Sequence, residues 1–132
     1  MFDEFSLLND VTYIFYADSV NGNIDCNVID CGSSKIVSCC GSVAKYVKNN
    51  LTGIRGESVR IYSPSDELRY NLFTKYNALK VRTEVIDNYN ILYCYDDKLS
   101  GYINIDGYKI NTQIVFDKQK IEVGYPIILT GY

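Results

Sequence analysis

The chain has 132 residues, enough for a single domain over residues 1–132, and its 47% hydrophobic and 22% charged residues are typical of a globular protein. Thirteen basic residues against 16 acidic ones give a net charge of -3, and no Lys/Arg run could neutralise several phosphates together, which argues against direct nucleic-acid binding. No stretch approaches the roughly 20 apolar residues that a transmembrane helix needs.

The first predicted element is a β-hairpin over residues 11–30. Apolar and polar residues alternate in its first half, and Asn21-Gly22 is typical of a type I′ turn. A two-residue turn at that position sets Phe15 opposite Val28, so both strands present their apolar residues on one face.

A short strand and a helix are predicted next, after a Gly-Ser-Ser turn at residues 32–34. The strand covers residues 35–40. Ser42 is a suitable N-cap for the helix, and Gly53 stands where a helix C-terminus favours a residue that tolerates positive φ. The apolar stripe of this predicted helix consists of Val43, Val47 and Leu51.

Residues 57–62 predict another strand, and residues 64–79 predict the second helix. Ser63 can cap this helix, and Pro64 suits its first position. Its apolar stripe consists of Leu68, Leu72, Tyr76 and Leu79. We expect this stripe to face the sheet.

The C-terminal part of the chain, from residue 81 on, predicts a meander of antiparallel strands. The turn Asp106-Gly107 joins a strand at 102–105 to a strand at 108–116 and sets Ile103 opposite Ile110.

A tight turn at Asp117-Lys118 then sets Ile114 opposite Ile121. Pro126 lacks a backbone donor and marks a bulge, a strand start or an edge before residues 127–130. All these elements together predict an α+β fold, in which a curved and mainly antiparallel β-sheet is packed by about two helices.

The strand that ends near Asp96 carries the candidate binding residues. Tyrosine is favoured in strands, but it also supplies a large contact area in recognition surfaces at low entropic cost. Tyr89, Tyr93 and Tyr95 share one strand face, and Asp96 and Asp97 would give them an acidic rim. If this face is not the core, these residues are predicted to form an exposed binding patch.

The composition argues against catalysis, because the chain has no histidine. Histidine is the usual general base, the usual partner of a Ser or Cys nucleophile and the commonest zinc ligand. No phosphate-binding glycine motif occurs either. We therefore predict no catalytic residue, no metal and no cofactor, and we interpret the protein as non-enzymatic.

Five cysteines are an odd number, so a closed set of disulfides would leave one thiol over. We interpret them as reduced thiols that serve as small apolar residues. In an extracellular protein, Cys26 with Cys31 or Cys39 with Cys94 could pair. Adjacent thiols at Cys39 and Cys40, before a predicted helix, leave thiol chemistry as an alternative.

The C-terminal segment carries a family resemblance. The strand Lys109-Ile-Asn-Thr-Gln113, the segment Val123-Gly-Tyr-Pro-Ile127 and the terminal Tyr132 resemble the K-x-N-x-Q strand, the V-G-T-P-I segment and the terminal tyrosine of the YwmB-like family of Firmicute proteins. The likeness covers about the last half of the chain. Tyr125 replaces the family's threonine, Gly131 replaces an acidic residue, and the family's signal peptide and longer N-terminal half have no counterpart.

This resemblance implies a sheet-and-helix fold similar to the TATA-box-binding protein. It also implies a family linked to the cell envelope without an established activity, so it transfers no functional residues to this chain.

Three hypotheses of function remain. The first is a non-enzymatic binding module that uses a sheet face or a strand edge, with a protein as the expected partner. The second is a small acidic inhibitor of the kind that phages encode, which blocks a partner's nucleic-acid-binding site. The third is a thiol or redox protein that uses Cys39 and Cys40.

The N-terminal segment Met1–Phe5 has two acids and no apolar run after it, so we expect the chain as written to be cytoplasmic. If an export signal preceded it, the cell envelope or secretion would be expected instead. A free strand edge would also allow a homodimer.

Overall fold

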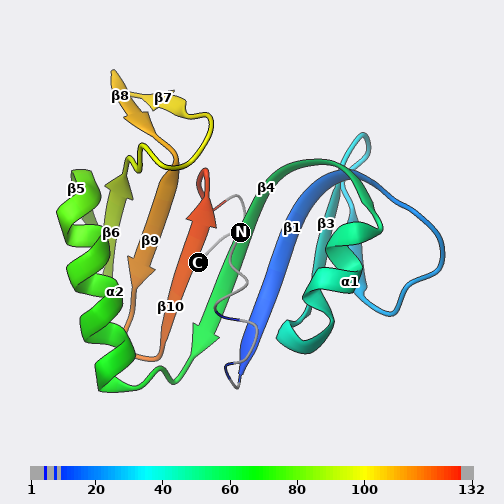
Figure 1. The fold of residues 1–132 in the computed structure, drawn as a ribbon, viewed down its shortest axis with the longest axis horizontal. Helices are drawn as coiled ribbons and strands as arrows, with labels where there is room; N and C mark the ends of the chain where they lie inside the picture. Colours follow the sequence, from blue (N-terminus) through cyan, green and yellow to red (C-terminus); the bar gives the residue numbers. More distant parts are fainter. Residues whose placement is uncertain (1–4, 6–7, 9, 129–132) are drawn as a thin grey trace.

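A computed structural model describes residues 5, 8 and 10–128, and in it one eight-stranded antiparallel sheet runs through the molecule (Figure 1). The predicted α+β fold is confirmed. In spatial order, the strands are β2 (Asn27–Asp30), β3 (Lys35–Cys40), β1 (Val11–Val20), β4 (Leu51–Tyr62), β10 (Lys120–Tyr125), β9 (Thr112–Phe116), β6 (Tyr89–Cys94) and β5 (Lys80–Ile86). The two edges of this sheet are therefore β2 and β5.

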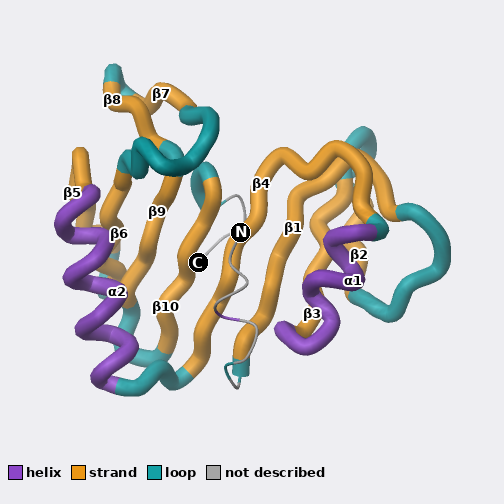
Figure 2. The backbone as a smooth tube through the Cα atoms, viewed as in Figure 1, coloured by secondary structure: helices purple, strands orange, loops and turns teal. Residues whose placement is uncertain are grey.

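Two helices cover the same face of the sheet, one over each half (Figure 2). The first is α1 (Ala44–Asn49), which follows a single 3-10 turn, η2 (Gly41–Val43), and the second is α2 (Asp66–Leu79). The main core lies between the helices and the sheet and includes Phe15, Val37, Val47, Val59, Leu72, Tyr76, Ile114 and Ile121. A smaller cluster of Ile91, Val115 and Ile128 forms a second core.

The apolar stripe predicted for the second helix is confirmed, but its cap is not the predicted one. Leu72 and Tyr76 are buried in the main core. The capping residue is Ser65, whose side chain accepts a hydrogen bond from Leu68 N at 3.1 Å. Ser63 has a φ of 48° and donates its backbone N–H to Gln119 O at 2.8 Å, so it belongs to the turn that leaves β4.

The predicted first hairpin is wrong, because β3 lies between β1 and β2. Phe15 pairs with Val37, and Val37 pairs with Val28 on its other side. β3 contributes buried apolar side chains to the core, whereas all four residues of β2 are exposed. The more apolar strand takes the inner position, which overrides the local turn signal of Asn21-Gly22.

The prediction of a first helix extending to residue 53 is also wrong. The helix ends at Asn49, and Leu51 already pairs with Val20 at the start of β4. Gly53 lies inside β4 with a φ of +68°, where a Cβ atom would collide with the side chain of Asp18. Ser42 lies inside the 3-10 turn η2 and is not the N-cap of that turn or of α1. Long-range pairing of β4 with β1 therefore limits the helix.

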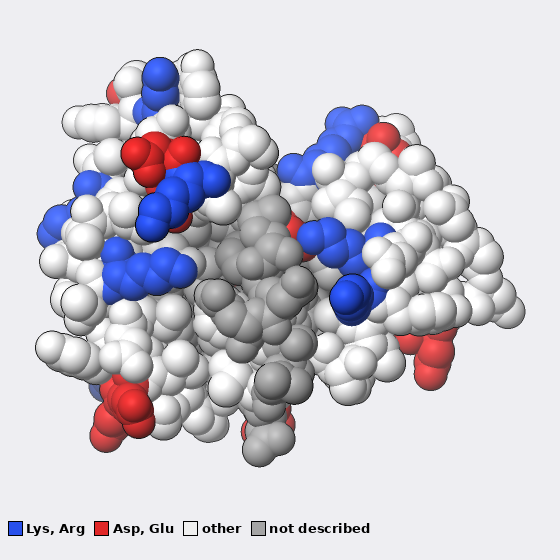
Figure 3. Space-filling model, in the orientation of Figure 1, with Lys and Arg blue, Asp and Glu red and all other residues white. Residues whose placement is uncertain are grey.

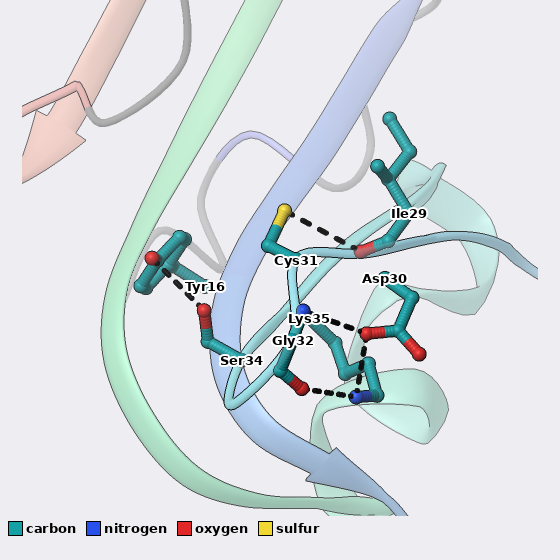
Figure 4. Close-up of polar contacts among 7 residues, drawn as sticks. All are labelled: Tyr16, Ile29, Asp30, Cys31, Gly32, Ser34 and Lys35. Atoms are coloured by element: carbon teal, nitrogen blue, oxygen red, sulfur yellow. Dashed lines mark hydrogen bonds and ion pairs between the residues drawn. The ribbon is translucent and has the colours of Figure 1, made fainter.

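The predicted turn at residues 32–34 is confirmed as the link between β2 and β3 (Figure 4). Asp30 Oδ1 accepts hydrogen bonds from Gly32 N at 2.9 Å and from Lys35 Nζ at 3.1 Å. Ser34 Oγ donates to Tyr16 Oη at 3.0 Å, so this turn is tied to the neighbouring strand β1.

The hairpin at Asp106-Gly107 is confirmed, with Ile103 opposite Ile110. It forms a separate two-stranded sheet of β7 (Ile103–Ile105) and β8 (Tyr108–Ile110), which lies above β6 and β9 in the view of Figure 1. The single strand predicted at 108–116 is broken, because Asn111 interrupts it and turns β9 into the main sheet.

The register predicted for the last two strands is shifted by two residues. Phe116 pairs with Ile121, and Ile114 pairs with Val123. Residues 117–119 link the two strands, and Asp117 N donates to Lys120 O across this turn at 3.0 Å. The shift by two leaves the same side chains on the buried face. Of the strand predicted at 127–130, Ile127 and Ile128 are not in a strand, and residues 129 and 130 lie outside the described residues.

Candidate functional site

A groove lies between α2 and the edge strand β5. Its volume is about 560 Å³. We call it the α2–β5 groove; its lining includes Tyr70, Phe73 and Asn77 of α2, Thr83 and Val85 of β5, and Leu92 and Phe116 from the sheet floor. Figure 1 shows α2 lying along this end of the sheet.

The helix side of the groove is formed by residues outside the buried stripe of α2. Tyr70 is 71% exposed and Phe73 is 49% exposed. The Phe73 ring packs edge-to-face on Phe116, with centroids 5.7 Å apart, and this contact forms the bottom of the groove. Large apolar side chains that stay this exposed are typical of a surface that another molecule covers.

The strand side of the groove offers backbone hydrogen-bonding groups. Ile86 and Tyr89 pair across the two-residue turn that joins β5 to β6. Residues that flank such a turn are a hydrogen-bonded pair, and bonded and non-bonded pairs alternate along an antiparallel ladder. The N–H and C=O groups of Thr83 and Val85 therefore point away from β6, toward the free edge.

The rest of β5 is protected against pairing with strands of other molecules. Its register shifts between Lys80 and Arg82, and the strand carries the charged side chains of Arg82 and Glu84. Irregularities and charges of this kind blunt a strand edge. The open part of the edge is thus confined to the segment beside the groove.

Two of the three charged residues that line the groove are basic. Arg69 and Lys80 line it, and Arg69 Nη2 donates to Lys118 O at 2.7 Å, which ties α2 to the β9–β10 loop. The third charged lining residue is Glu84, and its carboxylate accepts a hydrogen bond from Tyr93 Oη at 3.2 Å. On the face of the molecule seen in Figure 3, basic and acidic side chains are interspersed.

The residues of the predicted tyrosine patch lie near this end of the sheet but outside the groove. Tyr89 and Tyr93 are half-buried and pack against the small core of Ile91, Val115 and Ile128. The Tyr95 ring contacts Tyr102 edge-to-face at 6.4 Å.

The two acidic residues predicted to flank the patch, Asp96 and Asp97, lie in different environments. Asp96 is held by Asn111, which bonds to both its N–H and its C=O, whereas Asp97 is exposed. That these five residues bind a partner stays a prediction.

All five cysteines are free thiols. Cys39 and Cys94 are buried, which agrees with the interpretation of thiols as small apolar residues, and burial raises the pKa of each to about 12. Among the residues that the structure describes, no three Cys, Asp or Glu side chains are placed so that they could hold a metal ion. In the same part of the chain, neither helix combines the length and apolar character of a membrane span.

Comparison of the chain with protein-family models, with curated proteins and with solved structures finds no match in any of the three. The resemblance to the YwmB-like family therefore stays a prediction. The structure does give the K-x-N-x-Q residues a structural role, since Asn111 holds the loop at Asp96 and Gln113 Oε1 accepts from Ile128 N at 2.7 Å.

Sequence reasoning missed the residues of the α2–β5 groove. Tyr70 and Phe73 fall outside the predicted apolar stripe of the helix. Two large aromatic residues beyond that stripe were the available sequence signal of a second, exposed contact surface on the helix. That they face Thr83 and Val85 follows only from the packing of α2 on the sheet edge, which local patterns do not contain.

Proposed function

We propose that this protein is a non-enzymatic binding module that takes up an extended segment of a partner protein at the α2–β5 groove. The segment adds to the edge of β5 as a further strand and places alternate side chains in the groove. Strand addition of this kind draws affinity from main-chain hydrogen bonds and specificity from pockets for alternate side chains. The single observation that carries the proposal is an open strand edge directly beside an apolar groove.

The lining defines the partner segment. Tyr70, Phe73 and Val85 favour an apolar side chain, and Val85 is 70% exposed. Arg69 and Lys80 at the groove favour acidic residues that flank this side chain. The volume of about 560 Å³ is in the range of specific binding pockets.

The test is selection of a random peptide library displayed on phage against the immobilised protein, followed by affinity measurements with the enriched peptides. We expect enriched sequences with apolar residues at alternate positions and acidic neighbours. On binding, the amides of Thr83 and Val85 should become protected from hydrogen exchange.

Two matched pairs of variants locate the site. Thr83→Pro removes an outward backbone donor, which an edge strand tolerates, and it should abolish peptide binding, whereas Thr83→Val keeps the donor and should retain binding. Tyr70→Ala should weaken binding, whereas Tyr46→Ala removes another highly exposed tyrosine, from α1, and should not. Failure to enrich any peptide, or unchanged binding by Thr83→Pro, would contradict the proposal. A dimer that Thr83→Pro converts to a monomer would show that the occupant is a second copy of the chain.

A further inference from the structure

A second hollow, of about 340 Å³, lies at the opposite end of the sheet and is lined by three thiols. β2 pairs with β3 only as far as Ser38, so the last two residues of β3, Cys39 and Cys40, have no partner in β2. Cys26, which precedes β2, lines the same hollow together with Cys39 and Cys40. We call this site the thiol hollow.

The three thiols differ in exposure and in acidity. Cys39 is buried in the main core, and burial, with smaller contributions from Cys40 and Cys26, raises its pKa to about 12. Burial and the charge of Asp25 raise the pKa of Cys26 as well. Neither thiol is therefore a ready nucleophile at neutral pH, because the thiolate is the reactive form.

Cys40 has the opposite properties. Its side chain is exposed, and Sγ lies 3.2 Å from Ser42 Oγ. The Ser42 side chain lowers the pKa of Cys40, and the backbone groups of Val43 and Ser42 lower it further. Cys40 thus presents an accessible thiol of lowered pKa at the wall of a hollow that has room for a small added group.

We propose that Cys40 is a site of thiol–disulfide exchange with small cationic disulfides, and that the thiol hollow holds the added half. The Cys40 thiolate attacks one sulfur of a disulfide RSSR. A new bond forms between Cys40 Sγ and that sulfur, the original S–S bond breaks, and the second half leaves as a thiolate that takes a proton from water. Cys40 is oxidised to the mixed disulfide, and the leaving half is reduced to a thiol.

The preference for a cation follows from the lining. Asp25 is the one Asp, Glu, Lys or Arg residue that lines the thiol hollow among the described residues. Its carboxylate attracts a positively charged group and repels a negatively charged one.

The experiment uses the reduced full-length chain with three disulfides at low ionic strength and pH 7: cystamine, which is cationic, bis(2-hydroxyethyl) disulfide, which is neutral, and dithiodiacetate, which is anionic. Intact mass and peptide mapping give the site and rate of modification. Cys31, an exposed thiol in the β2–β3 turn, is the internal control (Figure 4). We expect Cys40 to react several-fold faster than Cys31, because the lowered pKa of Cys40 raises its thiolate fraction.

Variants test the two parts of the proposal separately. Cys40→Ser should remove the rapid adduct, Cys31→Ser should leave it, and Ser42→Ala should slow it. Asp25→Asn should slow the reaction with cystamine and speed the reaction with dithiodiacetate by roughly threefold each, the effect of one charge several ångströms away in water, so that the ratio of the two rates falls by roughly tenfold. A Cys31 rate equal to that of Cys40, a first adduct at Cys26, or a charge preference unchanged by Asp25→Asn would overturn it.

Discussion

Asn111 holds the backbone of Asp96 from both sides. Asp96 N donates to Asn111 Oδ1, and Asn111 Nδ2 donates to Asp96 O, each at 2.8 Å. Asn111 Nδ2 also donates to Gly101 O at 3.2 Å. This fully buried amide therefore fixes the loop that leads from β6 to the β7–β8 hairpin.

Replacement of Asn111 by alanine should destabilise the protein by about 1–3 kcal/mol, because the partly buried N–H and C=O groups of Asp96 lose their partner. Asn111→Asp should be as harmful, since a carboxylate accepts from Asp96 N but cannot donate to the two carbonyls. Urea unfolding measures the loss. Asn104→Ala, which removes an exposed amide from β7, is the control and should change stability by less than about 0.5 kcal/mol. Equal effects of Asn104→Ala and Asn111→Ala would contradict this role.

The capping residue of α2 can be tested directly against its neighbour two positions earlier. Ser65→Ala should cost about 1 kcal/mol, because the N–H of Leu68 loses its acceptor. Ser63→Gly should instead stabilise the protein, by up to about 1 kcal/mol, since Ser63 has a φ of 48° that glycine adopts without strain. Thermal unfolding of both variants gives the sign of each change in stability. A larger loss of stability for Ser63→Gly than for Ser65→Ala would indicate that Ser63 is the capping residue.

Elements that depend on neighbours in the sequence were predicted well. The stripe of α2 and the hairpin at Asp106-Gly107 need only local spacing, and both are confirmed. The partner of β1 was predicted wrongly, because Asn21-Gly22 is a strong local turn signal. The competing strands β3 and β4 become visible only when long-range pairing is compared.

The two candidate sites also show which features local sequence can predict and which only the fold reveals. The sequence singled out Cys39 and Cys40 as adjacent thiols, but only the fold shows that one is in the core and the other at the surface. The α2–β5 groove needs the placement of α2 beside the edge strand, so no pattern of spacing could have predicted it.

Gly124 is required where the chain turns back after β10. A Cβ atom there would lie 2.6 Å from Ile128 N and 2.7 Å from the carbonyl carbon of Ile127, and backbone atoms cannot move aside cheaply. Gly124→Ala should therefore cost about 1–3 kcal/mol, as overpacking usually does. The amide of Ile128, which donates to Gln113, should also exchange faster with solvent. An Ile128 amide that stays protected in Gly124→Ala would show that the clash is relieved elsewhere.

The buried pair of Glu122 and Arg60 predicts an unusual pH dependence. Glu122 is 1% exposed, its Oε1 accepts from Arg60 Nε and Nη2 at 3.0 Å, and its Oε2 has no hydrogen-bond partner among the described residues. Burial raises the pKa of Glu122, against the opposing charges of Arg60 and Lys120. The folded protein therefore holds this proton more tightly than the unfolded chain does.

The sign of the effect follows from this difference in proton binding. The stability contributed by Glu122 is complete below its unfolded pKa of about 4.3 and falls as the pH rises through the folded pKa, because the ionised carboxyl is the less favoured form in the fold. Glu122→Gln removes the titration and can still accept from Arg60. The free energy of unfolding of the wild type minus that of Glu122→Gln, from urea unfolding at a series of pH values, should decrease as the pH rises from about 4 toward 7. A difference that grows over this range would mean that Arg60 stabilises the carboxylate by more than burial destabilises it, and that the folded pKa is lowered.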